Sequence, residues 1–207
     1  MTNSANADPE QLLHQARAGD GPTLGRLLEL YRAYLGVLAR VQIGRRLQGK
    51  VDASDLVQEA FLVAYRDFPQ FRGTTENEFR SWLRQILASL LANLVRHYQG
   101  AQCRDVRLER RLTVELDQSS QALDRGLVAA QESPSQQAAR REQSLVLAEA
   151  LGRLPEEWRE LLILRHLEGL TFPEVAKRLG RTVDSVKKLW PRALAGLRRL
   201  LEKDTPS

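Results

Sequence analysis

Residues 171–190 read TFPEVAKRLGRTVDSVKKLW, and this stretch decides the fold of the C-terminal part of the chain. Thr171 and Glu174 have the spacing of a capping box, so a helix is predicted to begin there. Gly180 is suited to the turn that ends a helix, and Thr182 can cap a second one. A short helix, a glycine turn and a second helix together predict a helix-turn-helix.

The second of these helices is predicted to enter the major groove of duplex DNA, as such helices do. Nine basic and two acidic residues lie between Lys177 and Lys203, a local surplus of positive charge that favours contact with phosphates. A helical hairpin whose charges only face water is the alternative. The side chains expected to reach base edges or phosphates are Arg181, Thr182, Asp184, Ser185, Lys187, Lys188 and Arg192.

Pro191 lies inside the second helix, where it removes an amide donor. The helix is therefore expected to stop or bend at Pro191, or residues 193–203 are expected to form a separate helix.

Outside the helix-turn-helix, apolar residues recur at helical spacing in stripes over residues 24–38, 56–64 and 79–94. A further helix is predicted between Pro155 and Gly169, because proline suits a helix start and glycine a helix end. No alternation typical of β-strands occurs. The sequence predicts an all-α protein.

Composition divides the chain into two small helical domains. Residues 112–141 contain DQSSQ and QESPSQQ with few large apolar side chains, which indicates a flexible linker with room for some helix. The expected order is an N-terminal extension over residues 1–23, a helical domain over 24–111, this linker, and a helix-turn-helix domain over 142–207.

Bulk properties exclude several classes of protein. The net charge of +5 permits a polyanionic partner without proving one. Cys103 is the only cysteine, so an intramolecular disulfide and a cysteine-based zinc cage are excluded. No secretory signal is recognisable at the start, and no stretch has the roughly 20 apolar residues of a membrane helix. A soluble, cytoplasmic protein without a metal or cofactor is expected.

The stretch VDASDLVQEAFLVAYRDFPQF, residues 51–71, predicts a helix with a buried apolar stripe and an exposed face of acids and amides. That face is made of Asp52, Asp55, Gln58 and Glu59. It is either a solvated helix surface or a docking surface for a partner. A metal site is disfavoured because no histidine accompanies the carboxylates.

The next stretch combines a polar loop with a long helix that carries aromatic and basic residues. Seven basic and four acidic residues lie between Glu76 and Arg111, a surface that could meet single-stranded nucleic acid. Phe79 and Trp82 are nevertheless expected in the core, because they are in phase with the leucine stripe.

At this point the chain resembles a known family. DASDLVQEAFLVAYRDFPQF with FRSWLRQILA resembles region 2 of sigma-70 family RNA polymerase sigma factors. LPEEWRELLILRHLEGLTFPEVAKRLGRTVDSVKKLWPRAL resembles their region 4, and the two-domain plan resembles the extracytoplasmic-function (ECF) group.

The resemblance implies a non-catalytic initiation subunit that binds core RNA polymerase and promoter DNA. The acidic face would dock on the clamp helices of the largest subunit, and the C-terminal domain would rest on the flap. The helix-turn-helix would recognise the −35 element, while the N-terminal domain would capture a base flipped from the −10 element and melt the DNA. In the family an anti-sigma factor often masks both DNA-binding surfaces, and a chain that keeps the sigma architecture but acts chiefly through such a partner is a further alternative.

The residues that the resemblance assigns to −10 recognition and melting lie in the loop and in the long helix. They are Phe71, Arg72, Thr74, Thr75, Asn77, Arg80, Arg84, Ser89, Asn93 and Arg96. Many relatives have Asn and Asp at the positions aligned with Ser89 and Asn93, so this chain departs from the pattern there. Pro191 is a second departure.

Two other classes of function compete with this interpretation. An ordinary helix-turn-helix repressor or activator would bind duplex DNA without polymerase. An enzyme is disfavoured, since His14, His97 and His166 are far apart and no nucleophile motif or phosphate-binding loop occurs.

Overall fold

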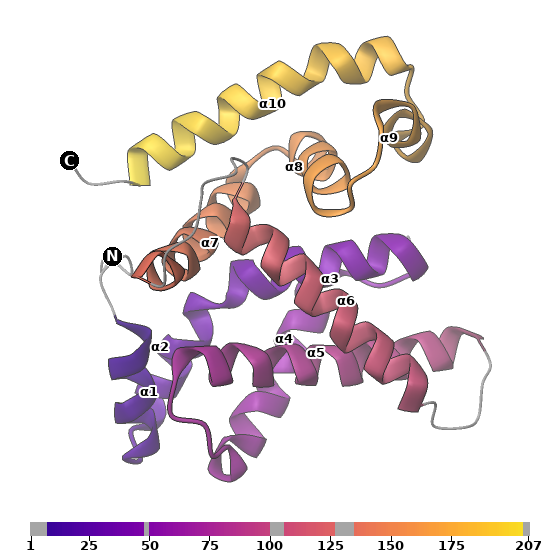
Figure 1. The fold of residues 1–207 in the computed structure, drawn as a ribbon. Coiled ribbons are helices and arrows are strands. Elements are labelled where there is room, and N and C mark those ends of the chain that lie inside the picture. The colour runs from indigo at the N-terminus through magenta and orange to yellow at the C-terminus, as the bar shows by residue number, and fades with distance from the viewer. Residues whose placement is uncertain (1–7, 48–49, 100–105, 127–134, 205–207) are drawn as a thin grey trace. The chain divides into compact units, whose positions relative to one another are not determined.

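The computed structural model describes residues 8–47, 50–99, 106–126 and 135–204, and every regular element in these ranges is a helix (Figure 1). The chain divides into two compact units, residues 1–117 and 118–207. These observations confirm the all-α, two-domain prediction. None of the described helices is both long and apolar enough to cross a membrane. Cys103 lies outside the described residues.

Unit 1 is built around three long helices and two short N-terminal ones. Its elements are α1 (Pro9–Arg17), α2 (Gly21–Leu30), α3 (Arg32–Arg46), α4 (Ala53–Asp67), the 3₁₀ turn η2 (Phe68–Gln70), α5 (Glu76–Gln99) and the first part of α6 (Val106–Arg125). Helices α3, α4 and α5 pack against one another, and α2 packs on α3 and α4.

Helix α1 belongs to this unit, although it falls in the segment predicted as an N-terminal extension. The Asp8 carboxylate caps it by accepting a hydrogen bond from Glu10 N. Leu12, Leu13 and Ala16 are buried where α1 packs on α2 and α5. The burial of Leu12 and Leu13 contributes roughly 3–6 kcal/mol to docking this nine-residue helix on unit 1.

The core of unit 1 is aromatic at its centre. Tyr31, where α2 ends and α3 begins, is fully buried, with its ring centroid 6.2 Å from that of Tyr34 and 5.5 Å from that of Phe79. Its hydroxyl donates to Glu76 Oε1 at 3.1 Å, which fixes the start of α5. Burial and the Glu76 carboxylate raise the pKa of Tyr31 well above its usual value.

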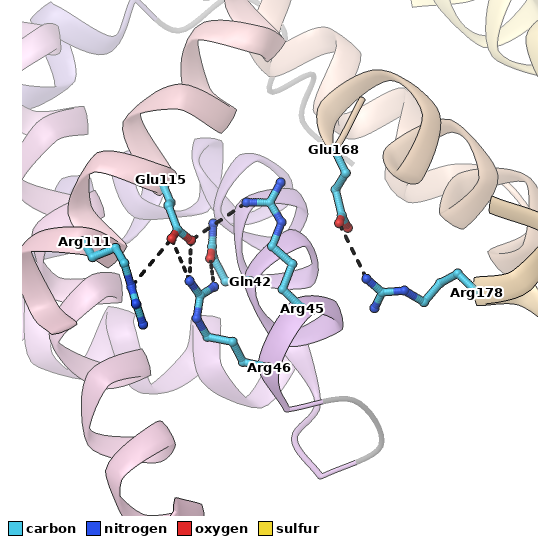
Figure 2. A network of polar contacts seen from close by, with 7 residues as sticks. All are labelled: Gln42, Arg45, Arg46, Arg111, Glu115, Glu168 and Arg178. Atoms are coloured by element: carbon cyan, nitrogen blue, oxygen red, sulfur yellow. Dashed lines mark hydrogen bonds and ion pairs between the residues drawn. The ribbon is translucent and has the colours of Figure 1, made fainter. Parts of the chain in front are cut away.

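Helix α6 is tied to α3 by a polar network that Figure 2 shows. Arg46 Nη2 lies 2.7 and 2.6 Å from the two carboxylate oxygens of Glu115, and Arg46 Nη1 donates to Gln42 Oε1 at 2.6 Å. Arg45 and Arg111 each lie 3.8 Å from the same carboxylate. Since α6 spans residues 106–125, it begins before the predicted 112–141 linker and ends inside it.

The helices of unit 2 pack against its longest helix, which is the last one in the chain. It contains α7 (Ser135–Arg153), α8 (Glu156–Leu162), the π-helical segment η3 (Ile163–Leu167), α9 (Phe172–Leu179) and α10 (Val183–Asp204). Helix α10 packs on α7, α8 and α9, and its buried residues include Val186, Ala193 and Leu197.

Pro191 does not end α10. The helix runs without interruption from Val183 to Asp204 and includes the proline. The expectations that it stops at Pro191, or that a separate helix follows, are therefore wrong. Pro191 is exposed, so its ring faces solvent. The residues beside it keep their packing, because Trp190 contacts the Phe172 ring of α9 and Ala193 is buried.

Candidate nucleic-acid interfaces and docking face

The acidic face predicted on residues 52–59 is exposed in the structure. Asp52 is the N-cap of α4, where its carboxylate accepts from Ser54 N at 2.6 Å. Asp55, Gln58 and Glu59 point away from the buried side of the helix, which carries Leu56, Val57 and Ala60 among others. The face therefore offers carboxylates and an amide to a partner.

Two large apolar side chains extend this face, and sequence reasoning missed them. Leu62 is 68% exposed and Tyr65 is 52% exposed, both on α4. Their positions follow Gln58 at helical spacing, so the acids are succeeded by an apolar patch along the same side of the helix. Exposed apolar side chains grouped in this way are typical of surfaces that bind other proteins.

The loop between η2 and α5, residues 71–75, is held by the first turn of α5. Glu78 Oε2 accepts from Thr74 N, Thr75 N and the Thr75 hydroxyl at 2.8–3.0 Å. Thr75 Oγ1 accepts in turn from Glu78 N at 3.3 Å, so these two residues form a capping box. The hydrogen bonds from Thr74 and Thr75 lower the pKa of Glu78.

Aromatic packing against α5 also supports the loop 71–75. The Phe71 ring lies 4.8 Å from Trp82 and 5.8 Å from Phe79, between ring centroids. Phe79 is buried and Trp82 is half-buried, as expected for core residues. Gly73 crosses directly over the Phe71 ring, where an added Cβ would come within 2.8 Å of Phe71 Cε2.

Two arginines assigned to promoter contact lie in the core of unit 1 instead. Arg80 is only 2% exposed, and its guanidinium lies over the Tyr34 ring, 4.7 Å from the centroid. Arg84 is 9% exposed and donates to Asp117 Oδ1 at 2.6 Å and to the Tyr34 hydroxyl at 3.0 Å. The prediction that Arg80 and Arg84 contact DNA is corrected, because both guanidiniums are covered by protein.

The remaining residues assigned to melting divide by exposure. In the loop and the first turn of α5, Arg72, Thr74, Thr75 and Asn77 are exposed and Phe71 is half-buried, while further along α5 Asn93 is exposed and Ser89 and Arg96 are half-buried. Ser89 donates to Glu109 of α6, and Arg96 donates to Asn93 Oδ1. The Thr75 hydroxyl is engaged in the cap.

In unit 2, the structure confirms the predicted helix-turn-helix. Glu174 Oε2 accepts from Thr171 N and from the Thr171 hydroxyl, both at 2.7 Å, at the start of α9. Gly180 ends α9 with a φ of 64°, a left-handed conformation that glycine adopts without strain. Thr182 Oγ1 then accepts from Ser185 N at 3.2 Å and caps α10.

The start of α10 presents the predicted contact residues to solvent. Arg181, Thr182, Asp184, Lys187, Lys188 and Arg192 are exposed, and Ser185 is half-buried. Arg181 is less free than the sequence suggests, because it forms an ion pair with Glu157 of α8.

The segment before α9 includes the π-helical η3. Glu168, which follows η3, forms an ion pair with Arg178 of α9 at 3.9 Å (Figure 2).

The structure offers no arrangement suited to metal chemistry within the described ranges, where no three His, Cys, Asp or Glu residues gather. Among the histidines, His166 stacks on Trp190 with ring centroids 5.1 Å apart. Burial, with a smaller effect of the Arg165 charge, lowers the pKa of His166.

Comparisons with known proteins match both units. The family model "Sigma-70 region 2" matches residues 30–100, and "Sigma-70, region 4" matches residues 144–197. The ECF RNA polymerase sigma factor BldN of Streptomyces coelicolor is 30% identical over 98% of this chain and 69% of its own length. The RNA polymerase sigma-H factor of Pseudomonas aeruginosa is 28% identical over 93% of each chain.

One solved structure, CnrH in complex with the cytosolic domain of CnrY, aligns with 96% of this chain and 100% of that chain. The sequence identity is 24% and the TM-score is 0.34.

Proposed function

The chain belongs to the sigma-70 family of RNA polymerase sigma factors, and from that membership we propose a division of labour between its two units. Unit 1, which carries region 2, docks on core polymerase through α4 and opens the −10 element through the loop 71–75 and α5. Unit 2, which carries region 4, recognises the −35 element through α10. The observation that carries this proposal is that each region match falls in its own unit, with exposed assigned side chains on both units, among them Arg72 and Asn77 on unit 1 and Lys187 and Lys188 on unit 2.

For unit 2, the supporting geometry is the capped helix-turn-helix with a cationic helix start. Lys187 and Lys188 are exposed within the first two turns of α10, the part of a recognition helix that meets base edges and phosphates. Arg198 and Arg199 are also exposed but lie about three turns further along the same helix. This pair provides a matched control.

The −35 assignment is tested by removing two positive charges at either end of α10. The variant Lys187→Ala/Lys188→Ala should lower the affinity of the holoenzyme for duplex −35 DNA by about tenfold or more, because each lost phosphate or base contact costs on the order of 1 kcal/mol or more. Arg198→Ala/Arg199→Ala should cost much less. Equal losses in both variants would indicate unspecific electrostatics rather than recognition by the start of α10.

For unit 1, the exposed loop supports base capture. Arg72, Thr74 and Asn77 are exposed beside a loop backbone that Glu78 and the Phe71–Trp82 stack restrain. A preordered loop loses little conformational entropy when it binds a nucleotide. Arg80 and Arg84 take no part in this proposal.

The docking face is proposed to combine the acids of α4 with its apolar end. Asp55 and Glu59 would meet basic side chains of the polymerase clamp helices, and Leu62 and Tyr65 would bury apolar area beside them. Such an arrangement, with an apolar patch beside charges, is common in protein interfaces.

The experiment that tests docking is co-elution with bacterial core RNA polymerase in size-exclusion chromatography. Asp55→Arg/Glu59→Arg should abolish co-elution, whereas Glu10→Arg/Glu29→Arg, which reverses two exposed charges elsewhere in unit 1, should retain it. If the wild-type chain stays apart from core but binds duplex DNA by itself, the simple helix-turn-helix regulator replaces the polymerase-docking proposal.

We further propose that the chain acts without catalytic chemistry or cofactor of its own, and that an anti-sigma factor controls it. Both follow from the family alone. Affinity capture of an anti-sigma factor on the tagged full-length chain, and competition of that factor with core polymerase, would test the second point.

A further inference from the structure

Arg17, the last residue of α1, reaches the loop that is proposed to capture the flipped base. Arg17 Nη1 donates a hydrogen bond to the carbonyl oxygen of Gly73 at 2.8 Å, across 56 residues of sequence. This contact connects the N-terminal helix to residues 71–75, which are also supported by η2 and by α5.

The position of Arg17 does not depend on this hydrogen bond. Helix α1 is held by its own cap at Asp8 and by the burial of Leu12, Leu13 and Ala16 against α2 and α5. The guanidinium is exposed, so little packing is lost if the side chain is removed. Arg17 therefore projects from a fixed helix toward the loop.

The contacts on the loop backbone are complementary. Glu78 accepts from the amides of Thr74 and Thr75, and Arg17 donates to the carbonyl of Gly73, so three consecutive residues are fixed by two charged side chains from different helices. Gly73 itself admits no side chain, because an added Cβ would overlap the Phe71 ring and would lie 2.9 Å from Glu78 Cβ. The loop backbone has little room to move while both contacts are made.

We propose that Arg17 is a positioning residue for promoter opening: it holds the Gly73 carbonyl so that the exposed side chains of Arg72 and Thr74 face the displaced base. Arg17 itself does not touch DNA in this proposal. The inference rests on the proposed function of the loop.

The test uses holoenzyme formed from the full chain and core RNA polymerase, on a promoter selected in vitro with the wild-type holoenzyme. 2-Aminopurine placed in turn at each −10 position reports base flipping by its fluorescence. Arg17→Ala should lower the equilibrium extent of flipping by about two- to tenfold, the range for the net contribution of one ordinary hydrogen bond, because this bond is exposed to water. Arg17→Lys, which keeps a charged donor group without the planar guanidinium, should fall between Arg17→Ala and wild type.

Controls separate positioning from folding. Arg26→Ala removes an exposed arginine from α2 and should leave flipping unchanged. Arg17→Ala should retain the affinity for core and for duplex −35 DNA. On a pre-opened promoter with an abasic site at the flipped position, wild type and Arg17→Ala should bind equally, because the loop then has no base to hold.

A double variant tests whether Arg17 acts through the loop. Gly73→Ala should displace the backbone and reduce flipping to a low but measurable extent, and adding Arg17→Ala should then lower it by a smaller factor than Arg17→Ala does in the wild-type chain. The proposal for Arg17 is overturned if Arg17→Ala flips the base as well as the wild type does. It is also overturned if Arg17→Ala binds the abasic promoter more weakly than the wild type. If Arg72→Ala and Thr74→Ala leave flipping intact, the assignment of the loop fails and the proposal for Arg17 fails with it.

Discussion

Glu115 allows the effect of burial on ion-pair strength to be measured within one domain. Its carboxylate pairs with Arg46 at 2.6 Å, and the two side chains are 19% and 16% exposed. Glu29 pairs with Arg32 at 2.7 Å, a nearly identical distance, but these side chains are 59% and 46% exposed. Both acids lie on helices of unit 1, so Glu→Ala is the same chemical change at each site.

The expected losses differ severalfold. Removing one partner of a well-buried pair costs about 3–5 kcal/mol, and the residual exposure here reduces this to about 2–3 kcal/mol for Glu115→Ala. The contacts of Glu115 with Arg45 and Arg111 add little, because the distances are 3.8 Å and Arg111 is largely exposed. Glu29→Ala should cost about 0.3–0.5 kcal/mol, because the pair joins two exposed side chains, one at the end of α2 and one at the start of α3.

Urea unfolding followed by tryptophan fluorescence measures both losses. Trp82 is the tryptophan of unit 1, so Trp158 and Trp190 are replaced by phenylalanine in all variants. With a slope of about 1.5 kcal/mol per molar urea, Glu115→Ala should lower the midpoint by roughly 1.3–2 M and Glu29→Ala by roughly 0.2–0.3 M.

Equal midpoints for the two variants would refute the reasoning from burial. A second check is the variant Arg46→Ala/Glu115→Ala. Because it leaves no uncompensated Arg46 charge, it should be more stable than the sum of the two single losses predicts.

Four further predictions concern packing and protonation. Gly196→Ala places a Cβ 2.9 Å from Trp158 Cε3 and should destabilise unit 2 by about 1–3 kcal/mol in urea unfolding; a neutral result would contradict the packing. The pKa of His166 is lowered on folding, so the unfolded state takes up the proton first as the pH falls below 6.5. Thermal stability should therefore decrease from pH 7.5 to 5.5, and His166→Gln should reduce that decrease. Arg84→Ala should cost about 2–4 kcal/mol of stability, since it removes buried hydrogen bonds; reduced DNA affinity at unchanged stability would return Arg84 to the interface. Pro191→Ala restores an amide donor inside α10 and should raise the urea midpoint, whereas a lower midpoint would show that the ring is needed there.

Local patterns allowed the helix-turn-helix to be predicted from sequence. Thr171, Glu174, Gly180 and Thr182 act on neighbours within three or four residues, and the structure shows their caps and turn as expected. The acidic face of α4 was predictable for the same reason, since helical periodicity separates it from the buried side.

The arginines of α5 were assigned wrongly because their partners are distant. Arg84 is bonded to Tyr34, 50 residues earlier, and to Asp117, 33 residues later. A signal was nevertheless present, because Arg80 and Arg84 are in phase with the buried Leu87 and Leu91. A long cationic side chain is usually expected at the protein surface. Only the tertiary fold reveals that aromatic and acidic partners cover the Arg80 and Arg84 side chains.

The role of α1 could not be derived from its sequence either. Nine residues predict a helix only weakly, and the hydrogen bond from Arg17 to Gly73 joins segments that are unrelated in the linear pattern.

If the loop 71–75 captures the flipped base as proposed, its contrast with the helix that follows it bears on how promoter preference can change. Arg72, Thr74 and the neighbouring Asn77 are exposed, so exchanging them alters the surface while changing stability by roughly 0.5 kcal/mol or less. Arg80 and Arg84 cannot be exchanged so cheaply, because the core depends on them. Divergence among copies of such a gene, or redesign in the laboratory, can therefore proceed through the loop and the first turn of α5 while Arg80 and Arg84 are kept constant.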